Sequence, residues 1–110
     1  MTDDPGRDDA AEDPHYFVVR GRRWRRTDPD LPEDVVAALQ SHLGSARATV
    51  GAAGRRGDEA AVAAARRRVG VAKHGLGERG PRWWEEPLEG RIERARDALR
   101  DLEEGDPADG

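Results

Sequence analysis

Two runs of apolar residues, spaced alternately three and four apart, constrain the fold of this chain more than any other feature. The first run is Val36, Leu39, Leu43, Ala46 and Val50, and the second is Val62, Ala65, Val69, Ala72 and Leu76. This spacing lines up each run on one face of a helix, as in a coiled coil. Each run covers only about two heptads, so we expect the two helices to pack on each other as an antiparallel helical hairpin.

Start and stop signals place these helices at residues 32–53 and 58–76. Side-chain oxygens that could cap the first helix come from Thr27, Asp28 and Asp30. Asp58 is suited to cap the second helix, and the three glycines of residues 51–57 predict a turn between the two. The second helix is expected to stop near Gly75 or Gly77. Two such alanine-rich helices could also pair with a second copy of the chain, as a four-helix dimer.

A short β-hairpin is predicted over residues 16–26, where strand-forming residues flank Gly21. A loop at residues 21–22 places Val19 opposite Trp24, whereas a loop at residues 20–21 places Phe17 there. In both registers Phe17, Val19 and Trp24 share one face, and Arg23 and Arg25 share the other. We expect the aromatic face to dock on the helical pair, because an isolated hairpin is only marginally stable in water.

The chain after the second helix reads as a tryptophan-containing loop, residues 77–87, and a third helix, residues 88–104. Of the adjacent Trp83 and Trp84, we expect one to cap the core and the other to be partly exposed. The third helix follows from the stripe Leu88, Ile92, Ala95, Leu99 and Leu102, with charged residues such as Arg91 on the other faces. It could pack on the helical pair or stand away from it.

At 110 residues the chain is long enough for one domain, which we place at residues 15–104. Residues 1–14 are predicted to be a disordered acidic tail and residues 105–110 a second tail. The expected fold is therefore mainly α. A short N-terminal β-hairpin packs on an antiparallel helical hairpin, followed by the tryptophan loop, the third helix and disordered acidic ends.

Charge is segregated along the chain. Residues 15–84 carry fourteen basic and seven acidic residues, whereas residues 1–14 carry one against six and residues 85–110 carry four against ten. There is no cysteine, no apolar run of membrane-spanning length and no secretory signal at the N-terminus. We therefore expect a cytoplasmic protein without a membrane partner.

Few patterns in the sequence suggest catalysis. No serine or threonine lies in a recognisable nucleophile setting beside a histidine, and His15, His42 and His74 lack the spacing of a metal site. The G-x-G-x-x-G at residues 75–80 follows a predicted helix instead of a strand, so we interpret it as a helix end and loop. We expect no enzyme activity, no metal, no cofactor and no small-molecule substrate.

Arginines interleaved with tryptophan form the most distinctive chemical pattern. The candidate contact surface for another macromolecule comprises Arg22, Arg23, Trp24, Arg25, Arg26, Arg66, Arg67, Arg82, Trp83 and Trp84. We expect this small protein to be a non-enzymatic interaction module that binds a protein or a second copy of itself. The alternative is a sequence-independent nucleic-acid-binding protein screened by its acidic tails.

Three segments together resemble a known family: Tyr16-Phe17-Val18-Val19-Arg20-Gly21-Arg22-Arg23-Trp24-Arg25, then Thr27-Asp28-Pro29, and the stretch from Ala72 to Glu85. The family consists of small proteins from bacteria with GC-rich genomes, often labelled "biopolymer transporter Tol". The resemblance covers about residues 16–86 and implies one compact module that contains both tryptophan clusters. Its label implies transport, which the absence of a membrane span, a signal peptide or propeller repeats contradicts. His74-Gly75 departs from the family pattern, where stronger helix formers are expected.

Overall fold

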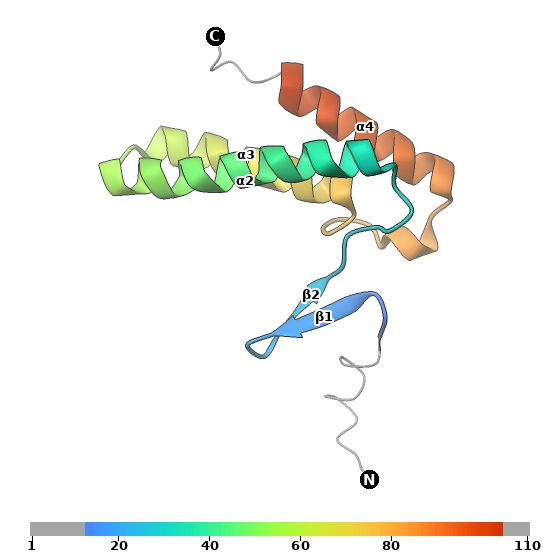
Figure 1. Ribbon diagram of the computed structural model, residues 1–110. Helices are drawn as coiled ribbons and strands as arrows, with labels where there is room; N and C mark the ends of the chain where they lie inside the picture. Colours follow the sequence, from blue (N-terminus) through green and yellow to red (C-terminus); the bar gives the residue numbers. More distant parts are fainter. Residues whose placement is uncertain (1–12, 105–110) are drawn as a thin grey trace.

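The computed structural model describes residues 13–104 and confirms the mainly helical fold (Figure 1). Its elements in chain order are the strands β1 (Tyr16–Val19) and β2 (Arg22–Arg25), the helices α2 (Glu33–Arg56) and α3 (Glu59–Leu76), the 3-10 turn η1 (Trp83–Glu85) and the helix α4 (Leu88–Glu104). The predicted tails lie outside the described residues, apart from Asp13 and Pro14.

Helices α2 and α3 lie side by side, and α4 packs against both of them (Figure 1). The core consists of Leu31, Val35, Leu39, Leu43, Ala72, Leu76, Ala95, Ala98 and Leu102. The third helix thus packs on the pair, and this widens the buried face of α2 beyond a two-helix contact. Val35 and Ala53 are buried where the predicted stripe has Val36 and Val50, which are only half-buried.

The first helix ends three residues later than predicted. It continues through Gly51 and Gly54 and ends at Arg56, where Gly57 adopts the left-handed conformation with φ of 73°. Of the three glycines, only Gly57 is used as a helix terminator. The intervening alanines favour helix, and Ala53 is fully buried, so continuing the helix adds buried contact.

The capping prediction is right for α3 and wrong for α2. The Asp58 carboxylate accepts a hydrogen bond from the Ala61 amide at 3.0 Å, as expected of an N-cap residue. Helix α2 instead begins after Pro32 with no side-chain cap. Thr27 and Asp28 were expected to cap it, but their side chains bind groups from the C-terminal half of the chain.

Helix α3 runs through His74 and Gly75 and ends at Leu76. Gly77 follows it in the left-handed conformation, with φ of 83°. A Cβ atom at Gly75 would lie 2.7 Å from the Cβ of Ala98. The absence of a side chain at Gly75 therefore lets α3 and α4 approach closely.

The hairpin adopts the register in which Phe17 pairs with Trp24, with the loop at Arg20 and Gly21. Both loop residues have positive φ, 53° and 81°, as a type I′ turn requires. The expectation that its aromatic face docks on the helices is wrong for Phe17 and Val19, which are 38% and 47% exposed. Only the base of the hairpin is anchored, and the rest extends away from the helices (Figure 1).

Candidate macromolecule-contact surface

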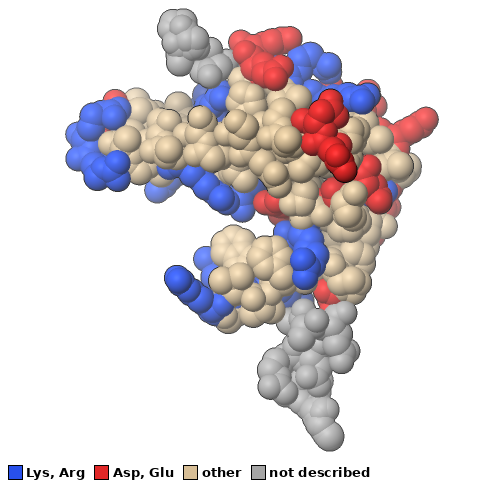
Figure 2. Space-filling view, viewed as in Figure 1, with Lys and Arg blue, Asp and Glu red and all other residues tan. Residues whose placement is uncertain are grey.

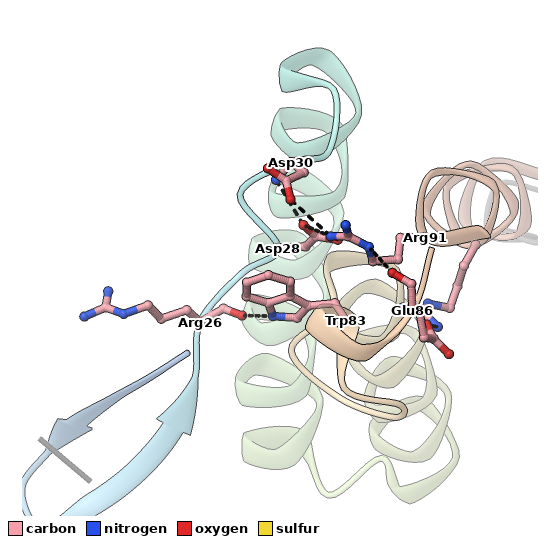
Figure 3. Close-up of polar contacts among 7 residues, drawn as sticks. Arg26, Asp28, Asp30, Trp83, Glu86 and Arg91 are labelled. Atoms are coloured by element: carbon pink, nitrogen blue, oxygen red, sulfur yellow. Dashed lines mark hydrogen bonds and ion pairs between the residues drawn. The ribbon is translucent and has the colours of Figure 1, made fainter. Parts of the chain in front are cut away.

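A buried ion pair lies where the segment after the hairpin meets the C-terminal half of the chain (Figure 3). Asp28 is 1% exposed, and both its carboxylate oxygens accept from Nη1 of Arg91, at 2.9 and 3.0 Å. The same guanidinium donates to Asp30 at 3.3 Å and, through Nε, to the Glu86 carbonyl at 3.1 Å. A buried arginine with this many acceptors fixes α4 against the segment that leads into α2.

Trp83 completes this cluster from the loop before α4. It is 7% exposed, and its indole nitrogen donates to the Arg26 carbonyl at 3.1 Å (Figure 3). The Arg91 guanidinium carbon lies 5.7 Å from the Trp83 ring centroid. We call Asp28, Trp83 and Arg91 the anchor cluster, because together they fix the end of β2 to the helices.

Further contacts hold the base of the hairpin on the tryptophan loop. Arg25 donates to the Gly80 carbonyl at 2.8 Å and lies over the Trp84 ring. His15 stacks on Trp84, with ring centroids 3.9 Å apart and planes 10° from parallel. Trp84 also meets Tyr16 edge to face. Trp83 in the core and Trp84 half-buried confirm the prediction for the tryptophan pair.

Beyond this base, the hairpin exposes a continuous apolar run. Phe17, Val18 and Val19 of β1 are 38%, 48% and 47% exposed, and no third strand joins the hairpin among the described residues. Exposed edge strands that are apolar and uncharged readily pair with other chains. This strand therefore has the character of a contact site.

Arginines from β2 and its end lie over aromatic rings of the hairpin. The Arg23 guanidinium carbon is 4.1 Å from the Tyr16 ring centroid, and that of Arg26 is 5.5 Å from the Phe17 centroid. Arg22 lies 4.6 Å from the Trp24 centroid. Contact with the rings restricts the movement of these guanidinium groups, and all three arginines are exposed and so accessible to anions. We call Phe17, Val18, Val19, Arg22, Arg23 and Arg26 the cationic hairpin surface.

Basic side chains also gather on the side of the helical pair that faces the hairpin (Figure 2). Lys73, which is 8% exposed, lies 5.2 Å from the Trp24 ring centroid and 3.9 Å from the Glu78 carboxylate. Burial lowers the pKa of Lys73, Glu78 opposes this, and the positive charges of Arg47 and Arg79 lower it further. The notch between the hairpin and the helical pair, at Trp24, thus has Lys73 of α3 on one side and Arg22 of β2 on the other (Figure 2).

The remaining predicted surface residues are divided between different places. Arg66 and Arg67 are both exposed on α3, but Arg67 lines a groove between α3 and α4 together with His74 and Arg94. Arg82 is exposed and donates to Glu85 at 3.3 Å. Trp83 is buried and anchors the hairpin, so its inclusion among the contact residues is corrected. Arg25 is likewise an anchor, because its guanidinium is bound by loop carbonyls.

Residues that sequence reasoning missed fall into two groups. Phe17 and Val19 were predicted to lie on the face that docks on the helices, since nothing local indicates that the hairpin extends outwards. Lys73 had one signal that could have been followed, because it is the single lysine in a chain with eighteen arginines. The anchor cluster joins residues 63 positions apart, a pairing that no local pattern predicts.

Over residues 13–104, no group of three His, Asp or Glu side chains could hold a metal ion. No helix in that range is long and apolar enough to cross a membrane. No family model, curated protein or solved structure matches this chain. The resemblance of residues 16–86 to the small bacterial family stays a prediction.

Proposed function

We propose that this protein is a cytoplasmic, non-enzymatic interaction module whose cationic hairpin surface binds another macromolecule, in the first place a protein. The observation that carries the proposal is the exposure of an apolar strand beside arginines that lie over aromatic rings, on a hairpin anchored mainly at its base. Arginine and aromatic residues are enriched at the centres of protein interfaces.

Site-specific photo-crosslinking in cells tests this proposal. A photo-reactive amino acid at position 22 should give adducts with a partner, because Arg22 is exposed on the hairpin. The same amino acid at position 96, an exposed site on α4, is the matched control and should give none. Adducts from position 96 with none from position 22 would place the contact elsewhere and end the proposal.

Nucleic-acid binding is the second candidate, favoured by the positive charge on both sides of the notch. Every ring on the hairpin already carries a guanidinium or ammonium group, so contacts to phosphates would predominate over base stacking. Binding of labelled single-stranded DNA and RNA to the full chain should then fall about tenfold or more between roughly 50 and 200 mM salt. No binding at the lower salt concentration rejects this candidate.

A further inference from the structure

We propose that the outer edge of β1 binds an extended acidic segment of a partner protein, which adds as a third strand to the hairpin. This inference rests on the proposed function, because it specifies what the cationic hairpin surface binds. It commits to a strand that carries glutamate or aspartate side chains and continues the backbone ladder of β1.

The backbone of β1 presents a free pairing edge at Val18. Arg26 donates its amide hydrogen to the His15 carbonyl at 2.8 Å, so residues 15 and 26 form a hydrogen-bonded pair. In an antiparallel ladder such hydrogen-bonded pairs alternate with pairs that exchange no backbone hydrogen bonds. In the observed register Val18 and Arg23 form a pair of the second kind. The Val18 amide and carbonyl therefore point away from β2, at a residue that is 48% exposed.

The charges around this edge select the side chains of the added strand. Arg23 lies in β2 and Arg26 directly follows it, yet their guanidinium groups lie over the Tyr16 and Phe17 rings of β1. Tyr16 and Phe17 are adjacent in β1 and point to opposite faces. A strand beside β1 thus finds a cation on each face, which favours acidic residues at successive positions.

The same geometry disfavours the other occupants. A second copy of the chain, pairing through its own β1, would bring an identical set of guanidinium groups alongside the first. Like charges on paired strands are destabilising. A nucleic acid has no main-chain amides with which to continue the ladder. A third strand would also stabilise the hairpin, since a two-stranded hairpin is only marginally stable in water and a three-stranded sheet is more stable.

Amide exchange and chemical shifts of the full chain provide the test, with a short peptide that carries glutamates at two successive positions between valines as the probe. The peptide should protect the Val18 amide from exchange and should shift β1 more than α4. Val18→Pro removes the amide donor that faces away from β2 and should weaken binding about tenfold. Val18→Thr keeps that donor and the β-branched shape, and should bind as the natural protein does.

Loss of the contact between Phe17 and Trp24 would show that the proline variant no longer forms the hairpin. Val18→Glu is the variant to use in that case. It keeps the backbone donor but should repel the acidic peptide. The inference is overturned when the peptide leaves Val18 unprotected, or when single-stranded DNA protects Val18 equally well. Crosslinks from position 22 without protection of the Val18 amide reject the third strand and leave the proposed interaction function standing. If position 22 gives no crosslinks and Val18 is unprotected, both proposals are rejected.

Discussion

The role of Arg91 differs from its place in the sequence pattern. The spacing of α4 assigns it to the charged outer faces of the helix, but it is 8% exposed and bound to Asp28, Asp30 and Glu86. The apolar residues of α4 indicate which face is buried but not where that face ends. Only the approach of Asp28, on a segment far away in sequence, makes a buried arginine favourable at this position.

Replacing one member of a buried ion pair leaves the other charge without compensation. We therefore expect Arg91→Leu to lower the free energy of unfolding by about 3 kcal/mol or more, because Asp28 stays buried. Arg96→Leu on the exposed side of the same helix should change it by less than about 0.5 kcal/mol. Denaturant unfolding of both variants measures the difference. Equal effects would show that the ion pair of Asp28 and Arg91 does not stabilise the fold.

His74 offers a prediction on pH. Partial burial lowers its pKa below the ordinary 6.5 and nearby Arg94 lowers it further, while Glu86 opposes this. On acidification the unfolded chain therefore binds this proton before the folded protein does, and stability should fall below about pH 6.5 until the folded His74 is also protonated. His74→Gln lacks this contribution. Thermal unfolding of the two proteins should diverge between about pH 7 and 5, and a constant difference would contradict the shift.

At the scale of elements, the sequence predicts most of what is local. The bounds of α4 and the end of α3 agree with the structure, because periodic apolar stripes and the left-handed Gly77 are local signals. The end of α2 was misplaced because glycine only weakens a helix, and tertiary burial of Ala53 outweighs that cost. The placement of the hairpin depends on contacts of Arg25 and Trp83 across the chain, which no local signal encodes.

Two helix glycines should respond in opposite directions to alanine. Gly44 of α2 faces open space, with nothing within 4 Å of an added Cβ, so Gly44→Ala should raise the free energy of unfolding by about 0.5–1 kcal/mol. Gly75→Ala should lower it by about 1–3 kcal/mol, since the new Cβ would meet Ala98 and Leu39. Denaturant melts of the two variants test the packing of α3 on α4. A stabilised Gly75→Ala protein would show that the two helices lie further apart.

At the scale of the whole molecule, charge and shape are arranged together. Positive groups lie on the hairpin and on the facing side of the helical pair, and acidic groups gather on the α4 side (Figure 2). The sequence predicts this segregation, because the basic and acidic residues occupy different parts of the chain. It does not predict that the anchor cluster fixes the end of β2 to the helices while Phe17, Val18 and Val19 stay exposed. Of the predicted contact residues, Arg22, Arg23 and Arg26 are exposed, whereas Trp83 is buried.

Charge reversal on the hairpin is the most direct test of the central claim, that this surface is where the protein meets its partner. Arg22→Glu with Arg26→Glu reverses two exposed charges and leaves the anchor cluster side chains in place. Arg96→Glu with Arg100→Glu changes the net charge equally on α4 and serves as the control.

The measurement is the amount of crosslinked partner recovered from cells for each protein, with the photo-reactive amino acid at position 19, beside the reversed charges. We expect the hairpin variant to lose the adducts, and the α4 variant to keep them at the level of the protein that carries neither pair of substitutions. Adducts that survive reversal of Arg22 and Arg26, or that disappear equally in both variants, would contradict it.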